Sequence, residues 1–267
     1  MYQQSRFTAT ICFRFAIVNI SSAIFECSAP DLDSCPDESL PEFAFIGRSN
    51  VGKSSLLNML AGKNGLARTS PTPGFTKLIN FFTMNKRWRL VDLPGYGYAQ
   101  VARKDKSQFN RAVNNYLKNR PNLCCVFALV DSGLEPQEMD VEFIEWLTRN
   151  SIPFVIVFTK TDKTGSAKVQ ANMAAFMARI AEWFAQPPVT FTCSSETGHG
   201  RKELLGVIGE TLAANPVELE SAEPPAPPAA APQPAEVEPP FSLRVRAGNL
   251  AENIPRAKKP PKGERPW

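Results

Sequence analysis

The stretch that decides the fold is Gly47-Arg48-Ser49-Asn50-Val51-Gly52-Lys53-Ser54, which matches the phosphate-binding pattern GxxxxGK[ST]. A short apolar run over residues 43–46 precedes it, and a stretch with helical spacing that opens with Ser54 and Ser55 follows it. Glycines at 47 and 52 let successive backbone N–H groups turn toward phosphate at the start of that helix. Lys53 is expected to reach the β- and γ-phosphates, and the Ser54 hydroxyl is expected to bind Mg²⁺.

Apolar runs and helical spacing alternate along the middle of the chain. The runs predict strands over residues 43–46, 78–82, 88–92, 123–130, 154–158 and 189–193, and the spacing predicts helices over 54–60, 106–118, 137–148, 167–184 and 201–212. This alternation predicts an α/β fold, a mainly parallel six-stranded sheet with helices on both faces, and the glycine-rich motif makes it one of the P-loop NTPase type. The link between residues 82 and 88 is too short for a helical crossover, so these two strands should form an antiparallel hairpin at one edge.

Composition divides the 267 residues into three parts. Of the 24 prolines, 13 fall in residues 216–267, which we expect to be a disordered, Pro/Ala-rich tail with a basic end. The nucleotide-binding domain is predicted over residues 40–215, which leaves 1–39 as an N-terminal extension. Residues 1–25 contain two arginines and no acid, so an organelle transit peptide, a local N-terminal strand and an over-extended start are all alternatives there.

Charge and cysteine usage bound the class of protein. The net charge of +4 lies on residues 1–215, because the tail holds equal numbers of acidic and basic residues. Six cysteines without a CxxC pair, beside the single histidine His199, argue against a zinc site and favour a reducing cytosol. No apolar run of 18 residues is free of charge, which argues against a membrane-spanning helix.

Two further motifs follow predicted strands and indicate which nucleotide is bound. Asp92-Leu93-Pro94-Gly95 fits a DxxG element, in which the Asp holds Mg²⁺ through water and the Gly N–H contacts the γ-phosphate. Thr159-Lys160-Thr161-Asp162 fits [NT]KxD, in which the carboxylate accepts hydrogen bonds from N1–H and the 2-amino group of guanine. Adenine lacks this pair of donors, so Asp162 would select GTP over ATP, and an ATPase or kinase is the weaker alternative.

A third motif, Cys193-Ser194-Ser195, closes another predicted strand, where backbone N–H groups would meet guanine O6. The motifs all follow predicted strands at their carboxyl ends, where open α/β sheets bind ligands.

With these residues in hand, the chain resembles the EngB (YihA/YsxC) family of P-loop GTPases. The resemblance rests on residues 47–58, on Thr69-Ser70-Pro71-Thr72-Pro73-Gly74-Phe75-Thr76, on residues 78–82 and on residues 92–99. It implies a role in assembly of the large ribosomal subunit, with rRNA and ribosomal proteins as partners, and in normal cell division and septation. It also implies a monomer in the bacterial cytoplasm.

The resemblance assigns further residues to the site. Thr76 corresponds to the switch threonine that binds Mg²⁺ and the γ-phosphate, and Gly74 and Phe75 precede it, with Phe75 where the family usually has Arg. The catalytic residues implied are Lys53, Thr76 and Gly95.

The residue after DxxG is Tyr96, where a Ras-like GTPase has the glutamine that orients the attacking water. We therefore expect slow intrinsic hydrolysis that a partner or K⁺ stimulates. Similar GTPases use an Asn at the position of Asn50 as a K⁺ ligand, and a structural hydrogen bond within the loop is the alternative. Arg103, Lys104 and Lys106 would form an RNA-contacting segment or a solvated helix start. A nucleotide-gated RNA- or protein-binding scaffold with negligible hydrolysis is the alternative function.

Overall fold

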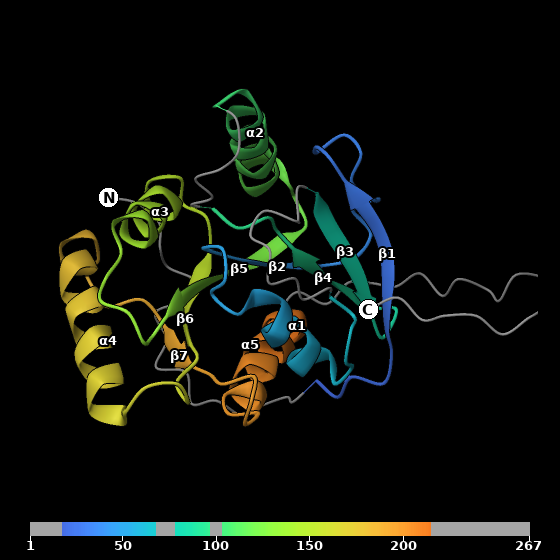
Figure 1. The fold of residues 1–267 in the computed structure, drawn as a ribbon. Helices are drawn as coiled ribbons and strands as arrows, with labels where there is room; N and C mark the ends of the chain where they lie inside the picture. Colours follow the sequence, from blue (N-terminus) through green and yellow to red (C-terminus); the bar gives the residue numbers. More distant parts are fainter. Residues whose placement is uncertain (1–17, 68–77, 97–102, 215–267) are drawn as a thin grey trace, which may run out of the picture. The chain divides into compact units, whose positions relative to one another are not determined.

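The computed structural model describes residues 18–67, 78–96 and 103–214, without the side chains of residues 103–110. A seven-stranded sheet forms the centre of this part of the chain (Figure 1), in the order β1-β3-β4-β2-β5-β6-β7. The strands are β1 (Ala23–Ala29), β2 (Glu42–Gly47), β3 (Ile79–Met84), β4 (Trp88–Asp92), β5 (Leu123–Asp131), β6 (Phe154–Thr159) and β7 (Thr190–Thr192). β4, β2, β5, β6 and β7 are parallel, which confirms the predicted α/β class.

The predicted hairpin is present, but it does not lie at the edge of the sheet. β3 and β4 pair antiparallel, from Asn80 opposite Asp92 to Met84 opposite Trp88. β1 then pairs antiparallel with β3 and forms the edge, so the expected number of six strands was wrong. β1 begins at Ala23 and overlaps only the last three of residues 1–25, and residues 1–17 lie outside the described part of the chain, so the alternatives for the N-terminal segment stay open.

β1 carries little sequence signal because its burial does not alternate. Ile24 and Phe25 are 55% and 51% exposed, and the pairing register shifts between Phe25 and Cys27. Such an irregularity breaks the period of two by which a half-buried strand is recognised.

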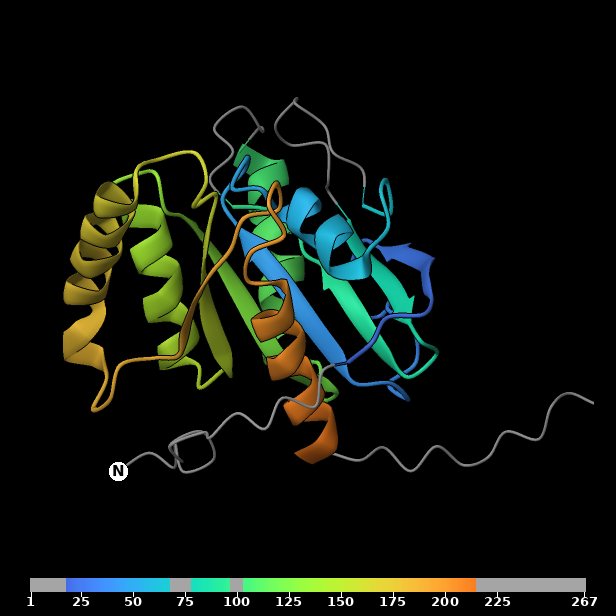
Figure 2. The same ribbon diagram turned by 90° about the horizontal axis from the view of Figure 1, so that it is seen from below.

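Helices cover both faces of the sheet (Figure 2), as predicted. They are α1 (Lys53–Ala61), α2 (Arg103–Asn119), α3 (Glu138–Arg149), α4 (Ser166–Ile180) and α5 (Arg201–Ala214). The helix expected over residues 167–184 ends at Ile180, and a single 3₁₀ turn, η1 (Ala181–Trp183), follows it.

β2 shows why two separate hydrophobic cores form. Phe43 and Phe45 pack with α1 and α5 on one face, whereas Ala44 and Ile46 pack with α2, α3 and α4 on the other. The Phe45 ring stacks on Phe127 of β5 with centroids 4.5 Å apart. Because β2 is buried on both faces, it reads as a continuous apolar run, as central strands of parallel sheets do.

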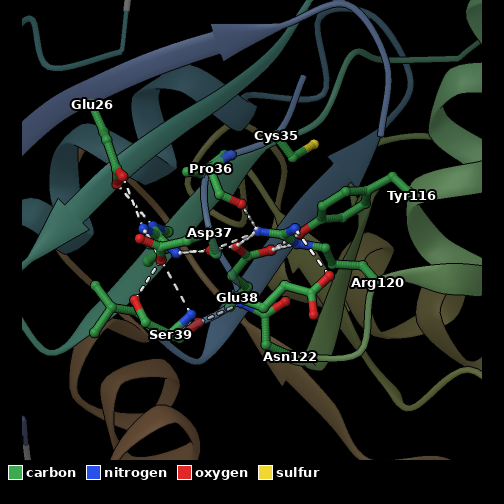
Figure 3. Close-up of polar contacts among 12 residues, drawn as sticks. Glu26, Cys35, Pro36, Asp37, Glu38, Ser39, Tyr116, Arg120 and Asn122 are labelled. Atoms are coloured by element: carbon green, nitrogen blue, oxygen red, sulfur yellow. Dashed lines mark hydrogen bonds and ion pairs between the residues drawn. The ribbon is translucent and has the colours of Figure 1, made fainter. Parts of the chain in front are cut away.

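A buried ionic cluster closes the amino-terminal end of the sheet (Figure 3). The carboxylate of Glu42, which is fully buried at the start of β2, accepts hydrogen bonds from the Tyr116 hydroxyl at 2.8 Å and from Arg120 Nε at 2.9 Å and Nη2 at 2.7 Å. Burial next to this carboxylate raises the pKa of Tyr116 well above its usual value.

Arg89 of β4 extends the cluster to the edge strand. It binds Glu26 of β1 through Nε at 2.8 Å and Nη2 at 2.9 Å, and its Nη1 donates to the Asp37 carbonyl at 2.6 Å. The cluster thus connects β1, the segment before β2, β4 and the carboxyl end of α2.

We expect Glu42→Gln to lower the free energy of unfolding by about 3 kcal/mol, because it removes one partner of a buried, hydrogen-bonded ion pair. Urea denaturation followed by circular dichroism measures this change. The matched control is Glu145→Gln, which removes a half-buried carboxylate paired with the exposed Arg149 one helical turn away and should cost less than about 0.5 kcal/mol. Equal losses in the two variants would contradict a stabilising role for the buried cluster.

Candidate nucleotide-binding site

The glycine-rich loop connects β2 to α1 in a backbone conformation that requires small residues. A Cβ atom at Gly47 would lie 2.7 Å from the Leu129 carbonyl oxygen of β5, so no side chain fits there. Asn50 and Gly52 both have left-handed backbone angles, with φ of 65° and 100°. Gly52 is the N-cap of α1. It has no side chain, so no N-cap side chain accepts hydrogen bonds from the first N–H groups of the helix. This is the geometry by which a helix N-terminus accepts phosphate.

The DxxG segment runs directly beside this loop. The Leu93 N–H donates to the Phe45 carbonyl at 3.0 Å, and the Tyr96 N–H donates to the Gly47 carbonyl at 3.2 Å. A Cβ at Gly95 would approach the Gly47 carbonyl oxygen to 2.8 Å, so this close passage also needs a glycine.

Lys53 and Asp92 meet between the two segments as a nearly buried ion pair, Nζ with Oδ1. The lysine expected to reach phosphate and the carboxylate expected to hold Mg²⁺ are therefore brought together, with Ser54 the next residue along α1.

The donor set fits Mg²⁺ bound together with phosphate. Within residues 18–67, 78–96 and 103–214, no group of three His, Cys, Asp or Glu side chains could form a cage for a metal ion. Mg²⁺ commonly uses one or two protein oxygens, nucleotide phosphates and water, and Asp92 and Ser54 would supply protein oxygens of this kind.

The TKxD motif follows β6 and contacts the glycine-rich loop. The Thr159 hydroxyl, which is buried, donates to the Val51 carbonyl at 2.6 Å. Lys160 adopts a left-handed conformation, and its stem lies over Gly52, where an added Cβ would be 3.7 Å from Lys160 Cε. The Lys160 ammonium donates to Asp131 Oδ2 at 2.7 Å. The end of β6 is therefore tied both to the loop and to the end of β5.

Asp162 and the motif after β7 lie side by side. The Ser194 hydroxyl donates a hydrogen bond that lowers the pKa of the Asp162 carboxyl. The Thr161 N–H donates to the Cys193 carbonyl at 3.3 Å, which joins the two strand ends. Ser194 is buried, whereas the neighbouring Ser195 is exposed.

Gly200 closes the loop that follows this motif. A Cβ at position 200 would lie 2.2 Å from the Thr192 carbonyl oxygen. The backbone at position 200 can therefore pass this close to β7 only with glycine.

Two carboxylates of the site were missed by the sequence reasoning. Asp131, at the end of β5, accepts the Lys160 ammonium and the Gly133 N–H at 3.0 Å. Its position as the first charged residue at the end of a long apolar run is a signal that could have found it. Asp140, in the first turn of α3, binds Arg48 and Tyr96, and only its acidity near a helix start marks it in the sequence.

Several predicted site residues lie outside the described part of the chain. These are Gly74, Phe75 and Thr76. The segment with Arg103, Lys104 and Lys106 begins α2, whose side chains are described from residue 111 onward. The predictions for these residues, for residues 1–17 and for the tail remain predictions.

Comparison with known proteins agrees with this geometry. Residues 42–160 match the family model described as "50S ribosome-binding GTPase". "Probable GTP-binding protein EngB" of Bacteroides fragilis is 48% identical over 191 residues, which are 72% of this chain and 95% of that protein. The protein of the same description from Porphyromonas gingivalis is 47% identical over 191 residues, again 72% of this chain and 95% of the relative.

Solved structures show the same fold. The crystal structure of "a probable GTP-binding protein engB" aligns with a TM-score of 0.51 at 26% identity, covering 65% of this chain and 99% of that one. Aquifex aeolicus Era bound to GDP and aluminium fluoride aligns with a TM-score of 0.53 at 20% identity, covering 64% of this chain and 56% of that one.

The fold and the motif geometry define a P-loop GTPase, a class of enzyme that hydrolyses GTP and generally uses Mg²⁺. With relatives of this identity and coverage, the chain belongs to the EngB family of GTP-binding proteins. Among the residues that the structure describes, no helix has the length and apolar character needed to cross a membrane.

We expect Asp162→Asn to weaken GDP binding by about 100-fold or more, because an amide cannot accept both hydrogen bonds from the guanine edge. Xanthosine diphosphate, which carries an oxygen in place of the 2-amino group, should bind this variant more tightly than GDP. Isothermal titration calorimetry with both nucleotides measures the switch.

The control for this variant is Lys163→Gln. Its ammonium lies 3.3 Å from Asp162 Oδ2, but the Lys163 side chain is 64% exposed. Because exposed pairs contribute little, it should change the GDP affinity by less than about threefold. Unchanged GDP affinity in Asp162→Asn would place the base elsewhere.

Proposed function

We propose that this chain binds GTP along the carboxyl edge of its sheet and hydrolyses it slowly while acting in assembly of the large ribosomal subunit. The observation that carries the proposal is the convergence at this edge of the glycine-rich loop, the Lys53–Asp92 pair, and Asp162 beside Ser194. The description of the matched family model, which names 50S ribosome binding, supports the ribosomal part. On the strength of the same family relationship, the proposal includes a role in cell division and septation, a cytoplasmic location and a monomeric state.

Each motif has a role in this proposal. Backbone N–H groups of the loop from Gly47 to Ser55 hold the phosphates, apart from those of Ser49 and Val51, which donate to backbone carbonyls within the protein, and Lys53 neutralises the β- and γ-phosphates. Ser54, Thr76 and, through water, Asp92 would hold Mg²⁺, which would supply charge neutralisation at the phosphates when bound. The Gly95 N–H contacts the γ-phosphate. The Thr159–Asp162 segment and the motif at Cys193, Ser194 and Ser195 recognise guanine.

The residue after DxxG explains why hydrolysis should be slow. The Tyr96 hydroxyl donates to Asp140 Oδ1 at 3.0 Å, and its ring packs on Phe143 with centroids 4.8 Å apart. A phenol engaged in this way does not orient an attacking water as a glutamine does. The same observation favours the alternative of a nucleotide-gated scaffold with negligible hydrolysis of its own.

Hydrolysis by the full-length protein in single-turnover experiments should be at least about tenfold faster with large ribosomal subunits, because a partner supplies the missing transition-state contacts. Small subunits serve as the control particle and should have no effect. Co-sedimentation in the GTP-analogue and GDP states measures binding. Absence of both stimulation and binding would contradict the ribosomal role, and binding without any hydrolysis would favour the scaffold.

Asn50 is the residue through which K⁺ would act. It is exposed on the loop, and its side chain makes no hydrogen bond to any residue within the described ranges. A structural hydrogen bond within the loop, the alternative to a K⁺ ligand, is not found among those residues. A monovalent cation at this position would add positive charge near the phosphates, as an arginine finger does.

GTP turnover should therefore be about tenfold faster in KCl than in NaCl at equal ionic strength, which is the scale of a modest electrostatic contribution to the transition state. Phosphate release under saturating GTP measures this ratio. Asn50→Ala should remove the difference between the two salts while retaining GDP binding. Equal turnover of the unmodified protein in the two salts would exclude the K⁺ role.

A further inference from the structure

One buried carboxylate joins the glycine-rich loop to the residue after DxxG. Asp140 is 1% exposed in the first turn of α3. Arg48 Nε donates to its two oxygens at 3.2 and 3.1 Å, and the Tyr96 hydroxyl donates to Oδ1 at 3.0 Å. Burial raises the pKa of the Asp140 carboxyl, whereas the contacts with Arg48 and Tyr96 act in the opposite direction. Hydrogen bonds from these partners offset the cost of removing the Asp140 carboxylate from water.

The backbones of the same two residues are also paired. Arg48 and Tyr96 form an isolated parallel bridge, in which the Ser49 N–H donates to the Tyr96 carbonyl at 3.2 Å and the Tyr96 N–H donates to the Gly47 carbonyl at 3.2 Å. The two segments are thus held together by their main chains and, through Asp140, by their side chains.

The ring of Tyr96 also contacts aromatic side chains of α3. It packs on Phe143, whose ring stacks on Trp146 with centroids 6.1 Å apart, and the Lys118 ammonium lies 5.5 Å from the centroid of Trp146. The phenol is therefore held between the carboxylate and an aromatic row on α3. Its side chain anchors the start of the segment that follows DxxG.

The remaining contacts of the nucleotide site do not involve Asp140. Thr159 holds the Val51 carbonyl, Lys160 binds Asp131, and Ser194 binds Asp162. These contacts support the parts of the site that receive the base and the inner phosphates. The Arg48–Asp140–Tyr96 contacts instead join the glycine-rich loop to the DxxG segment, the two elements that face the γ-phosphate in the proposed site.

We propose that Asp140 is a positioning residue that sets the spacing between the glycine-rich loop and Gly95 of the DxxG segment, and thereby the rate of GTP hydrolysis more than the affinity for nucleotide. This rests on the proposed function, because it assumes that the phosphates lie between these two segments. Tyr96 belongs to the same unit, because its hydroxyl binds Asp140 and it directly follows Gly95.

The test uses the full-length protein and three variants. Asp140→Asn keeps the shape but loses the charge and one acceptor, so hydrolysis in single turnover should slow by about tenfold while the GDP affinity stays within about twofold. Tyr96→Phe removes only the hydroxyl and should slow hydrolysis by about threefold. Because the two residues act as a unit, the double variant should be no slower than Asp140→Asn alone.

Glu138→Gln is the matched control. It removes a carboxylate from the same first turn of α3, where Glu138 is exposed and pairs with Arg179 at 2.6 Å. It has no contact with the loop, so hydrolysis should stay at the rate of the unmodified protein. A purely structural role for Asp140 would instead lower the GDP affinity and the hydrolysis rate together, which would overturn the proposal.

Two outcomes separate this proposal from the proposed function. If Lys53→Ala weakens GDP binding but Asp140→Asn hydrolyses at the unmodified rate, the positioning role is wrong and the site stands. If Lys53→Ala leaves GDP binding unchanged, the proposed site and the positioning role both fail. Should Asp140→Asn not fold, Tyr96→Phe decides alone, because an unchanged hydrolysis rate in that folded variant would overturn the proposal.

Discussion

The structure depends on one steric constraint, the close approach of the glycine-rich loop to β5. A side chain at position 47 would overlap the Leu129 carbonyl, and a side chain at position 95 would overlap the Gly47 carbonyl. Glycine at both positions allows the carboxyl ends of β2 and β5 and the DxxG segment to lie in close contact. The Thr159–Val51 hydrogen bond then adds the end of β6. The nucleotide edge is thus assembled largely from backbone, which suits a ligand recognised mainly through phosphate oxygens.

The polar groups at the two ends of the sheet have different partners. At the carboxyl end, backbone donors and a few charges converge where a highly charged ligand would neutralise them. At the amino end, two carboxylates and two guanidinium groups neutralise one another within the protein, those of Glu42, Glu26, Arg120 and Arg89, and they hold the edge strand and the segment before β2 in place. The ion pairs at the amino end hold the strands together without a ligand. The carboxyl end can therefore bind and release a nucleotide while the sheet stays intact.

The parts of the molecule predicted from sequence are those specified by local pattern. Central strands such as β2 and β5 are long apolar runs, and the glycine-rich loop, DxxG and TKxD follow them directly, so the fold class and most of the site could be placed. β1 could not, because its bulge at Phe25 and Cys27 removes the alternation. The helix end at Ile180 was missed because apolar residues continue through the following 3₁₀ turn.

The carboxylates missed at the site share a physical reason. Asp131 and Asp140 bind no ligand in the proposed mechanism, and each acts on a motif residue from another element, Lys160 in one case and Arg48 with Tyr96 in the other. Their partners lie 29, 92 and 44 positions away in the chain, so neither periodicity nor spacing connects them. Motifs identify the groups that touch a ligand, whereas the residues that position those groups are found through tertiary contacts. In this site the positioning residues are acidic because the groups that they hold are two cationic side chains and a phenol, all of which donate hydrogen bonds.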